Sequence, residues 1–66
     1  MNGKVVSDKL PVVIRRYADH RLFNTSKHLY VTLDDLHQMM EDGVAFVVYD
    51  TTTGWDITTT LLGPKV

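Results

Sequence analysis

Residues 31–43 read VTLDDLHQMMEDG, and this stretch predicts a helix with both of its ends marked. Thr32 and Asp35 have the spacing of a capping box, in which each side chain accepts a hydrogen bond from the backbone N–H of the other residue. Gly43 is a natural residue to follow the last turn of a helix. The pattern therefore predicts a helix over residues 33–42, about three turns long.

Short segments rich in β-branched and aromatic residues surround this helix and predict strands. The predicted strands are residues 12–17, 21–24, 29–31, 44–49 and 55–60. The last two are separated by a polar loop that ends in Gly54, and we expect them to pair as a hairpin. The expected fold class is α+β: a small single domain of antiparallel β-hairpins with one central short α-helix, in the order ββ(β)αββ.

The chain has 66 residues and no Cys, so its core is thin and no disulfide reinforces it. We expect a flexible leader over residues 1–11, the folded domain over 12–62 and a tail over 63–66. The chain has no long apolar run and no signal-peptide pattern, which predicts a cytoplasmic protein without membrane contact. A domain this small is often reinforced by oligomerisation, and we expect a homodimer.

The net charge of -1 hides an asymmetry along the chain. Residues 1–28 carry six Lys and Arg side chains against two Asp, a net charge of +4. Residues 29–66 carry one Lys against six acidic side chains, a net charge of -5. A basic half in a nearly neutral chain favours an anionic partner on one face, although an idle surface or attraction between the two halves would also explain it.

Cationic side chains gather in the first predicted hairpin and form the candidate binding site. The candidates for contact with DNA are Arg15, Arg16, His20, Arg21 and Lys27. Arg suits bidentate contact with phosphate or guanine. Arg15 and Arg16 are adjacent in one strand, so at most one of them faces the ligand from that strand. The alternative is a solvated basic hairpin or ion pairs with the acidic half.

Three segments resemble the DNA-binding domain of polyhydroxyalkanoate accumulation regulators. Residues 14–25, IRRYADHRLFNT, are similar to the family pattern I-K-K-Y-x-N-R-R-L-Y-D/N-T. Residues 30–36, YVTLDDL, are similar to Y-V-T-L-E-D-L. Residues 46–58 contain F-x-V-x-D, T-G and D-I-T in the family's order. The spacings agree across residues 12–62, and the ordered combination is more specific than any one segment.

The resemblance implies a bacterial transcriptional regulator, a repressor that binds double-stranded promoter DNA of genes for polyhydroxyalkanoate synthesis and granules. The alternative is a protein-interaction or oligomerisation module of the same fold with weak or no DNA binding. Asp19, His20 and Phe23 stand where the family usually has Asn, Arg and Tyr, so one basic group is lost and one acid is gained. Binding to polyester granules belongs to a longer C-terminal region of the family and is not carried over to this chain.

Several aromatic and apolar side chains could lie either in the core or on the surface. Tyr17, Phe23 and Tyr30 flank the basic residues and could stack on unpaired bases, but core packing is the favoured interpretation. For Met39, packing in the core and contact in a dimer interface are equally favoured interpretations. Met40 and Trp55 are expected in the core.

No pattern in the chain indicates catalysis. His20, His28 and His37 match no zinc-binding spacing, so we expect no metal and no cofactor. Asp34 and Asp35 are adjacent on the predicted helix, do not face each other as an acid–base pair, and are explained by capping. The sequence contains no nucleophile elbow and no phosphate-binding glycine loop. The protein is therefore not expected to be an enzyme.

Overall fold

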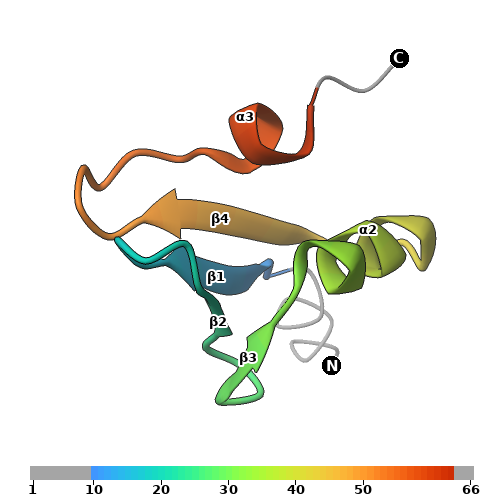
Figure 1. Cartoon of the computed structure of the whole chain (residues 1–66). Helices are drawn as coiled ribbons and strands as arrows, with labels where there is room; N and C mark the ends of the chain where they lie inside the picture. The colour runs from blue at the N-terminus through green and yellow to red at the C-terminus, as the bar shows by residue number, and fades with distance from the viewer. Residues whose placement is uncertain (1–9, 64–66) are drawn as a thin grey trace, which may run out of the picture.

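The computed structural model describes residues 10–63, which form a four-stranded sheet and two short helices (Figure 1). The elements are β1 (Val12–Arg16), β2 (Leu22–Asn24), β3 (Leu29–Val31), α2 (Leu33–Glu41), β4 (Phe46–Asp50) and α3 (Thr58–Leu62). This arrangement confirms the α+β class. Most of the expected leader, residues 1–9, and of the expected tail, residues 64–66, lies outside the described residues.

The sheet has the order β3-β2-β1-β4 and is mixed. β1 pairs antiparallel with β2 and β2 with β3, as the predicted hairpins require. β1 also pairs parallel with β4, with Ile14 opposite Val48. A parallel neighbour needs a long crossover, and the segment from β2 through α2 supplies it.

Helix α2 begins at the predicted residue and ends at Glu41, one residue before the predicted end. The Asp35 backbone N–H donates to Thr32 Oγ1 at 3.2 Å, and the Thr32 backbone N–H donates to Asp35 Oδ2 at 2.9 Å, which completes the capping box. At the other end, Gly43 has φ 77°, a conformation that glycine adopts without a steric penalty. The Val44 N–H then reaches the Met39 carbonyl at 2.9 Å, the long bond of a Schellman motif.

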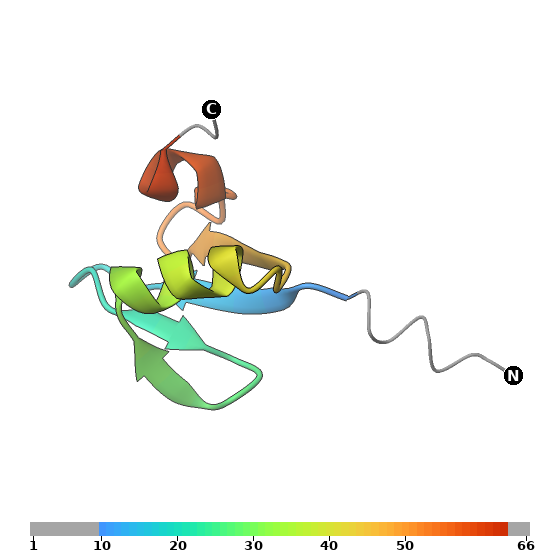
Figure 2. The same ribbon diagram turned by 90° about the vertical axis from the view of Figure 1, so that its right-hand side faces the viewer.

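The core lies on one side of the sheet only. Ile14 from β1, Leu22 from β2, Leu36 from α2 and Val48 from β4 are its buried apolar residues, and Ile14, Leu36 and Val48 are 0% exposed. Figure 2 shows α2 lying across the strands on this side. Partly buried residues complete the cluster: Val12, Val31, Met39, Phe46, Ile57, Leu61 and Leu62. Burying these side chains contributes roughly 1.5–3 kcal/mol each, which is the principal force holding this small sheet.

The prediction of a returning strand over residues 55–60 is wrong. Thr58–Leu62 form helix α3, and a single antiparallel bridge between Tyr49 and Asp56 remains of the expected hairpin. The Val48 backbone N–H donates to Thr58 Oγ1 at 2.8 Å, so a side chain replaces the ladder partner that a strand would offer. Leu61 and Leu62 then pack against the core. The β-branched Thr residues suggested a strand, and tertiary packing overrode that preference.

One buried polar side chain organises the β2–β3 turn. Asn24 is 2% exposed, and its Oδ1 accepts the backbone N–H groups of Ser26 at 2.8 Å and Lys27 at 3.0 Å. These bonds satisfy a carbonyl oxygen that would otherwise be costly to bury. They also tighten the turn in which His28 adopts φ 57°. Asn24 therefore fixes where β3 begins.

Two apolar residues expected in the core are exposed instead. Trp55 is 72% exposed in the loop after β4, and Met40 is 39% exposed near the end of α2. Met39, which the sequence divided between core and interface, packs against the core cluster. Leu36 is the one buried residue of this 9-residue helix.

Within residues 10–63, no helix is both long and apolar enough to span a bilayer.

Removing the cap should destabilise the domain measurably. Thr32→Ala deletes the acceptor for the Asp35 N–H and should cost about 1 kcal/mol of the free energy of unfolding. For a domain of this size the melting temperature should fall by about 4–8 °C, followed by circular dichroism. Thr51→Ala is the matched control, because Thr51 is exposed and its contact with Arg16 uses backbone atoms only. Equal melting temperatures for the two variants would contradict this account of the helix start.

Candidate functional site

Strand alternation separates the two adjacent arginines of β1. Ile14 is buried, so its neighbours Val13 and Arg15 point to the side of the sheet opposite the core. We call this side the open face; the strand residues on it are Val13, Arg15, Phe23, Tyr30, Val47 and Tyr49. Arg16 lies on the helix side with Asp50, its register partner. The expectation that at most one of the two arginines faces a ligand from β1 agrees with this geometry.

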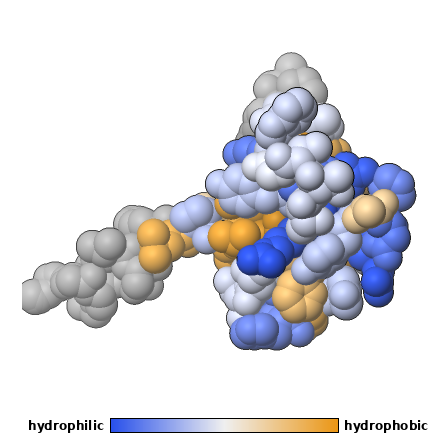
Figure 3. Space-filling model, turned by 90° about the vertical axis from the view of Figure 1, so that its left-hand side faces the viewer, coloured by the Kyte–Doolittle hydropathy of each residue, from blue (hydrophilic) through white to orange (hydrophobic). Residues whose placement is uncertain are grey.

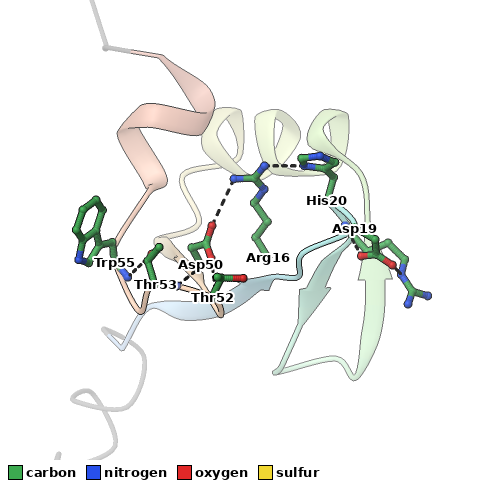
Figure 4. A network of polar contacts seen from close by, with 8 residues as sticks. Arg16, Asp19, His20, Asp50, Thr52, Thr53 and Trp55 are labelled. Atoms are coloured by element: carbon green, nitrogen blue, oxygen red, sulfur yellow. Dashed lines mark hydrogen bonds and ion pairs between the residues drawn. The ribbon is translucent and has the colours of Figure 1, made fainter.

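Arg16 is engaged within the protein (Figure 4). Its Nη1 lies 3.5 Å from Asp50 Oδ2, and its Nη2 donates to His20 Nδ1 at 2.6 Å. A guanidinium can only donate, so Nδ1 of His20 is the acceptor in this hydrogen bond. Asp50 is held in turn, because its Oδ1 accepts the Thr52 N–H at 2.7 Å. This network ties the end of β1 to the end of β4.

The β1–β2 turn is held by backbone bonds and by a local ion pair. The Tyr17 N–H donates to the Arg21 carbonyl at 2.9 Å, and the His20 N–H donates to the Tyr17 carbonyl at 2.8 Å. Asp19 receives the Arg21 backbone N–H at 3.2 Å and the Arg21 Nε–H at 2.7 Å. The bond from the Arg21 backbone, reinforced by its guanidinium, lowers the pKa of Asp19 below its ordinary value. Asp19 is therefore ionised at neutral pH and neutralises part of the charge of Arg21.

Arg21 also belongs to an aromatic group on the open face. Its Cζ lies 4.9 Å from the centroid of the Tyr30 ring, a cation–π distance. The Tyr30 and Phe23 rings meet edge to face, with centroids 5.1 Å apart and planes at 69°. Tyr30 is 53% exposed, so the expectation that these aromatic residues pack in the core is wrong for Tyr30. Phe23 is half-buried on the same face, shielded by its neighbours and not by a helix.

The five predicted DNA-binding residues do not form one cluster. Arg15 is exposed in the middle of the open face, and Arg21 is exposed in the turn at one end of β2. Lys27 is exposed in the turn at the other end of β2. Arg16 and His20 bind each other on the helix side. Arg15 therefore lies on the open face with Arg21 and Lys27 in the turns at its two ends, whereas Arg16 and His20 lie on the helix side.

The open face combines apolar surface with positive charge. Its strand residues include no carboxylate. Asp56 lies at the margin, where its backbone forms an antiparallel bridge with Tyr49. Its carboxylate accepts hydrogen bonds from the hydroxyl and the N–H of Thr58, and these bonds lower the pKa of Asp56. Figure 3 looks at the molecule from the side away from α2 and shows patches of hydrophobic residues near the centre with strongly hydrophilic residues next to them. Such a surface can contact an anionic, partly apolar partner.

Sequence reasoning considered stacking for Phe23 and Tyr30 but favoured core packing, and it did not consider Tyr49. Tyr49 and Tyr30 occupy the same cross-strand row as Arg15 and Phe23, and the row becomes visible only from the sheet register. Alternation along β1 predicted that Arg15 and Arg16 lie on opposite sides of the sheet, but not which of them lies on the open face. The alternation of β2 and β3 carried a signal too, because Leu22 and Val31 face the core and leave Phe23 and Tyr30 outside.

The described residues offer no arrangement for catalysis by a metal. No group of three or more His, Asp and Glu side chains lies close enough to hold a metal ion between residues 10 and 63. The chemistry that the open face can perform is non-covalent: cationic contact, stacking and apolar packing.

Two comparisons with known proteins agree with the resemblance seen in the sequence. Residues 13–64 match the family model described as the PHB/PHA accumulation regulator DNA-binding domain. A protein of Thiocystis violacea, described as an uncharacterized protein in the phbA 5′ region, is 36% identical over 50 residues. That match covers 76% of this chain and 36% of the relative, so the chain spans about a third of the relative's length. No solved structure matches the chain significantly.

The Asp19–Arg21 pair should make stability depend on pH in the acid range. The pKa of Asp19 is lower in the folded protein than its ordinary 3.8, so its contribution to stability is present above about pH 4. It is lost as the pH falls below 3.8 and the carboxylate takes up a proton. Asp19→Asn keeps an oxygen for the Arg21 N–H but cannot titrate, so its urea midpoint should fall less between pH 5 and pH 3 than that of the unmodified protein. Equal falls of the urea midpoint in both proteins would contradict this prediction. Asp34→Asn is the control, because it removes an acidic side chain of α2 without changing the Asp19–Arg21 pair.

Proposed function

The chain belongs to the family of PHB/PHA accumulation regulator DNA-binding domains, and from this membership we propose that it binds double-stranded promoter DNA through its open face. The observation that carries the proposal is the position of Arg15. It is an exposed guanidinium on the open face, flanked by Phe23 on β2 and Tyr49 on β4. Among the described residues it makes no ion pair, so binding DNA would not first require an internal contact to break.

A small sheet can present such a side chain to a duplex. Other proteins place strands in the major or minor groove of DNA, with the sheet face toward the bases. An Arg in the middle of that face reaches guanine O6 and N7, or a phosphate, by two parallel hydrogen bonds. Arg21 and Lys27 lie in turns at opposite ends of β2, which suits contact with the phosphates on the two sides of a groove.

Arg16 and His20 act indirectly in this proposal. Arg16 is shared between Asp50 and His20, and its guanidinium lies on the helix side. These contacts hold the β1–β2 turn, and through it Arg21, in place. Their role is to position the contact residues.

We propose that the domain regulates genes for polyhydroxyalkanoate storage, as a repressor working in the cytoplasm. The family description supports this role, as does the relative described by its position in a phbA 5′ region. The second candidate function is a protein-interaction or oligomerisation module with weak DNA binding. The Asp19 carboxylate favours it, because Asp19 holds Arg21 by two hydrogen bonds and brings negative charge to the contact region.

DNA binding should depend on salt and on Arg15. Fluorescence anisotropy with a duplex from the upstream region of a polyhydroxyalkanoate synthesis gene should show a log–log salt slope of about -0.9 for each phosphate neutralised. Arg15→Gln should weaken binding by about 1–3 kcal/mol if Arg15 reads a base. If Arg15 contacts phosphate, it should weaken binding to every sequence and reduce the salt slope by about one.

Arg16→Gln is the matched control for this experiment. It should lower the melting temperature, because Asp50 loses its ion-pair partner, and it should reduce the affinity of the folded protein less than Arg15→Gln does. A larger loss of affinity for Arg16→Gln than for Arg15→Gln would show that the open face is not the DNA-binding surface. No binding by the unmodified chain at low salt would favour the interaction module.

We also predict a homodimer at micromolar concentrations, formed through the edge of β3. The outer edge of β4 is covered by the segment that follows it, since the Ile57 N–H donates to the Val48 carbonyl at 2.8 Å. β3 is the other end strand, and no further strand of the described residues pairs with it. Light scattering should give twice the monomer mass, and Tyr30→Pro, which removes an edge N–H, should give a folded monomer. If Met39→Ala disperses the dimer and Tyr30→Pro does not, the interface is on α2 and the edge model is wrong.

A further inference from the structure

One row of side chains crosses the whole open face. The sheet register places Tyr49 of β4 beside Arg15 of β1, Arg15 beside Phe23 of β2, and Phe23 beside Tyr30 of β3. With neighbouring strands about 4.8 Å apart, the row is about 14 Å long. Three of its four members are aromatic, and no helix of the described residues covers them. The row therefore offers ring surface and a cation side by side.

A hollow extends this row at the β1–β2 turn. It is lined by Tyr17, Ala18, Asp19, Arg21 and Tyr30. The guanidinium of Arg21 lies over Tyr30, so a flat ligand entering here would meet a second flat cationic group beside the ring. The Asp19 carboxylate disfavours a phosphate in this hollow and can accept a hydrogen bond from a base amino group. The hollow suits a nucleobase better than a phosphate.

We infer that the open face binds single-stranded nucleic acid, with bases stacked on Phe23 and Tyr30 and the sugar–phosphate backbone near Arg15. Stacking requires bases whose flat faces are free, and in a duplex those faces are covered by neighbouring base pairs. Four-stranded sheets with exposed aromatic residues are known to take two or three unpaired bases in this way. The inference goes beyond duplex binding and can hold without it.

The charges of the face select this partner over a second copy of the chain. If two open faces packed on each other about a twofold axis, the two Arg15 side chains at their centres would be buried close together, with no carboxylate among the strand residues of either face. Such like charges would be costly to desolvate. A strand of nucleic acid instead supplies a phosphate for Arg15 and flat apolar bases for the rings.

The test is anisotropy with labelled oligo-dT and oligo-U of about 12 nucleotides, within the site sizes found for single-strand binding folds. The full chain should bind at least one of them saturably at low salt, and the ratio of the two affinities shows whether DNA or RNA is preferred. Tyr30→Leu keeps an apolar side chain but removes the stacking ring, so it should weaken binding by about 5- to 100-fold. Phe23→Leu should act in the same direction.

The matched control is Trp55→Leu, which removes an exposed aromatic ring from outside the row. It should change affinity less than twofold, a bound well below the loss of one stacked base. Circular dichroism checks that each variant is folded, and Tyr30→Leu keeps the test valid if Phe23→Leu unfolds, because Tyr30 is more than half exposed.

Three results would overturn the inference. The first is no binding to either oligonucleotide when a duplex of the same length binds, which would leave the proposed function standing. The second is binding that Arg15→Gln weakens and Tyr30→Leu does not, since that attraction would be purely electrostatic. The third is absence of oligonucleotide binding together with a dimer that Tyr30→Leu disperses, which would assign the face to a second copy. Loss of duplex binding alone, with oligonucleotide binding intact, would reject only the proposed function.

Discussion

The parallel pairing of β1 with β4 is the contact on which the rest of the structure depends. It places Ile14 beside Val48, and Leu36 of α2 and Leu22 of β2 complete the buried cluster around them. Because side chains alternate along a strand, burial of Ile14 on one side forces Arg15 to the other. A shift of one residue in this register would bury Arg15 and expose Ile14. The composition of the open face therefore follows from the packing of the core.

A chain of this length can cover only one face of its sheet. The two helices and the segment before α3 cover the core side of the sheet and the outer edge of β4. Side chains on the uncovered face are shielded from solvent by one another, as the half-buried Phe23 beside Tyr30 illustrates. Small single-core domains bury a modest fraction of their surface, and here the helices of residues 10–63 leave the open face uncovered.

The predictable parts of the fold were those specified by neighbouring residues. Thr32, Asp35 and Gly43 act within one helix, so their roles could be read from spacing alone. Thr58 could not be read in this way, because its hydroxyl receives the N–H of Val48, ten residues earlier, at the edge of another element. The parallel partner of β1 was likewise invisible, since 29 residues separate Arg16 from Phe46 and nothing local specifies their pairing. Within the candidate site, the separation of Arg15 from Arg16 followed from alternation, whereas the exposure of Tyr30 depended on a helix that covers only the other face.

The charge asymmetry of the sequence becomes a difference between the two sides of the sheet. Asp50 lies on the helix side and binds Arg16, which joins the acidic half of the chain to the basic half. On the open face the cation of Arg15 stands without a carboxylate in its row. Asp19 reduces the positive charge at the β1–β2 turn, because it forms a close pair with Arg21. With that charge partly neutralised, long-range attraction of phosphate is weaker there and the rings carry a larger share of any binding energy. A partner that offers base surface as well as phosphate matches this balance better than one that offers phosphate alone.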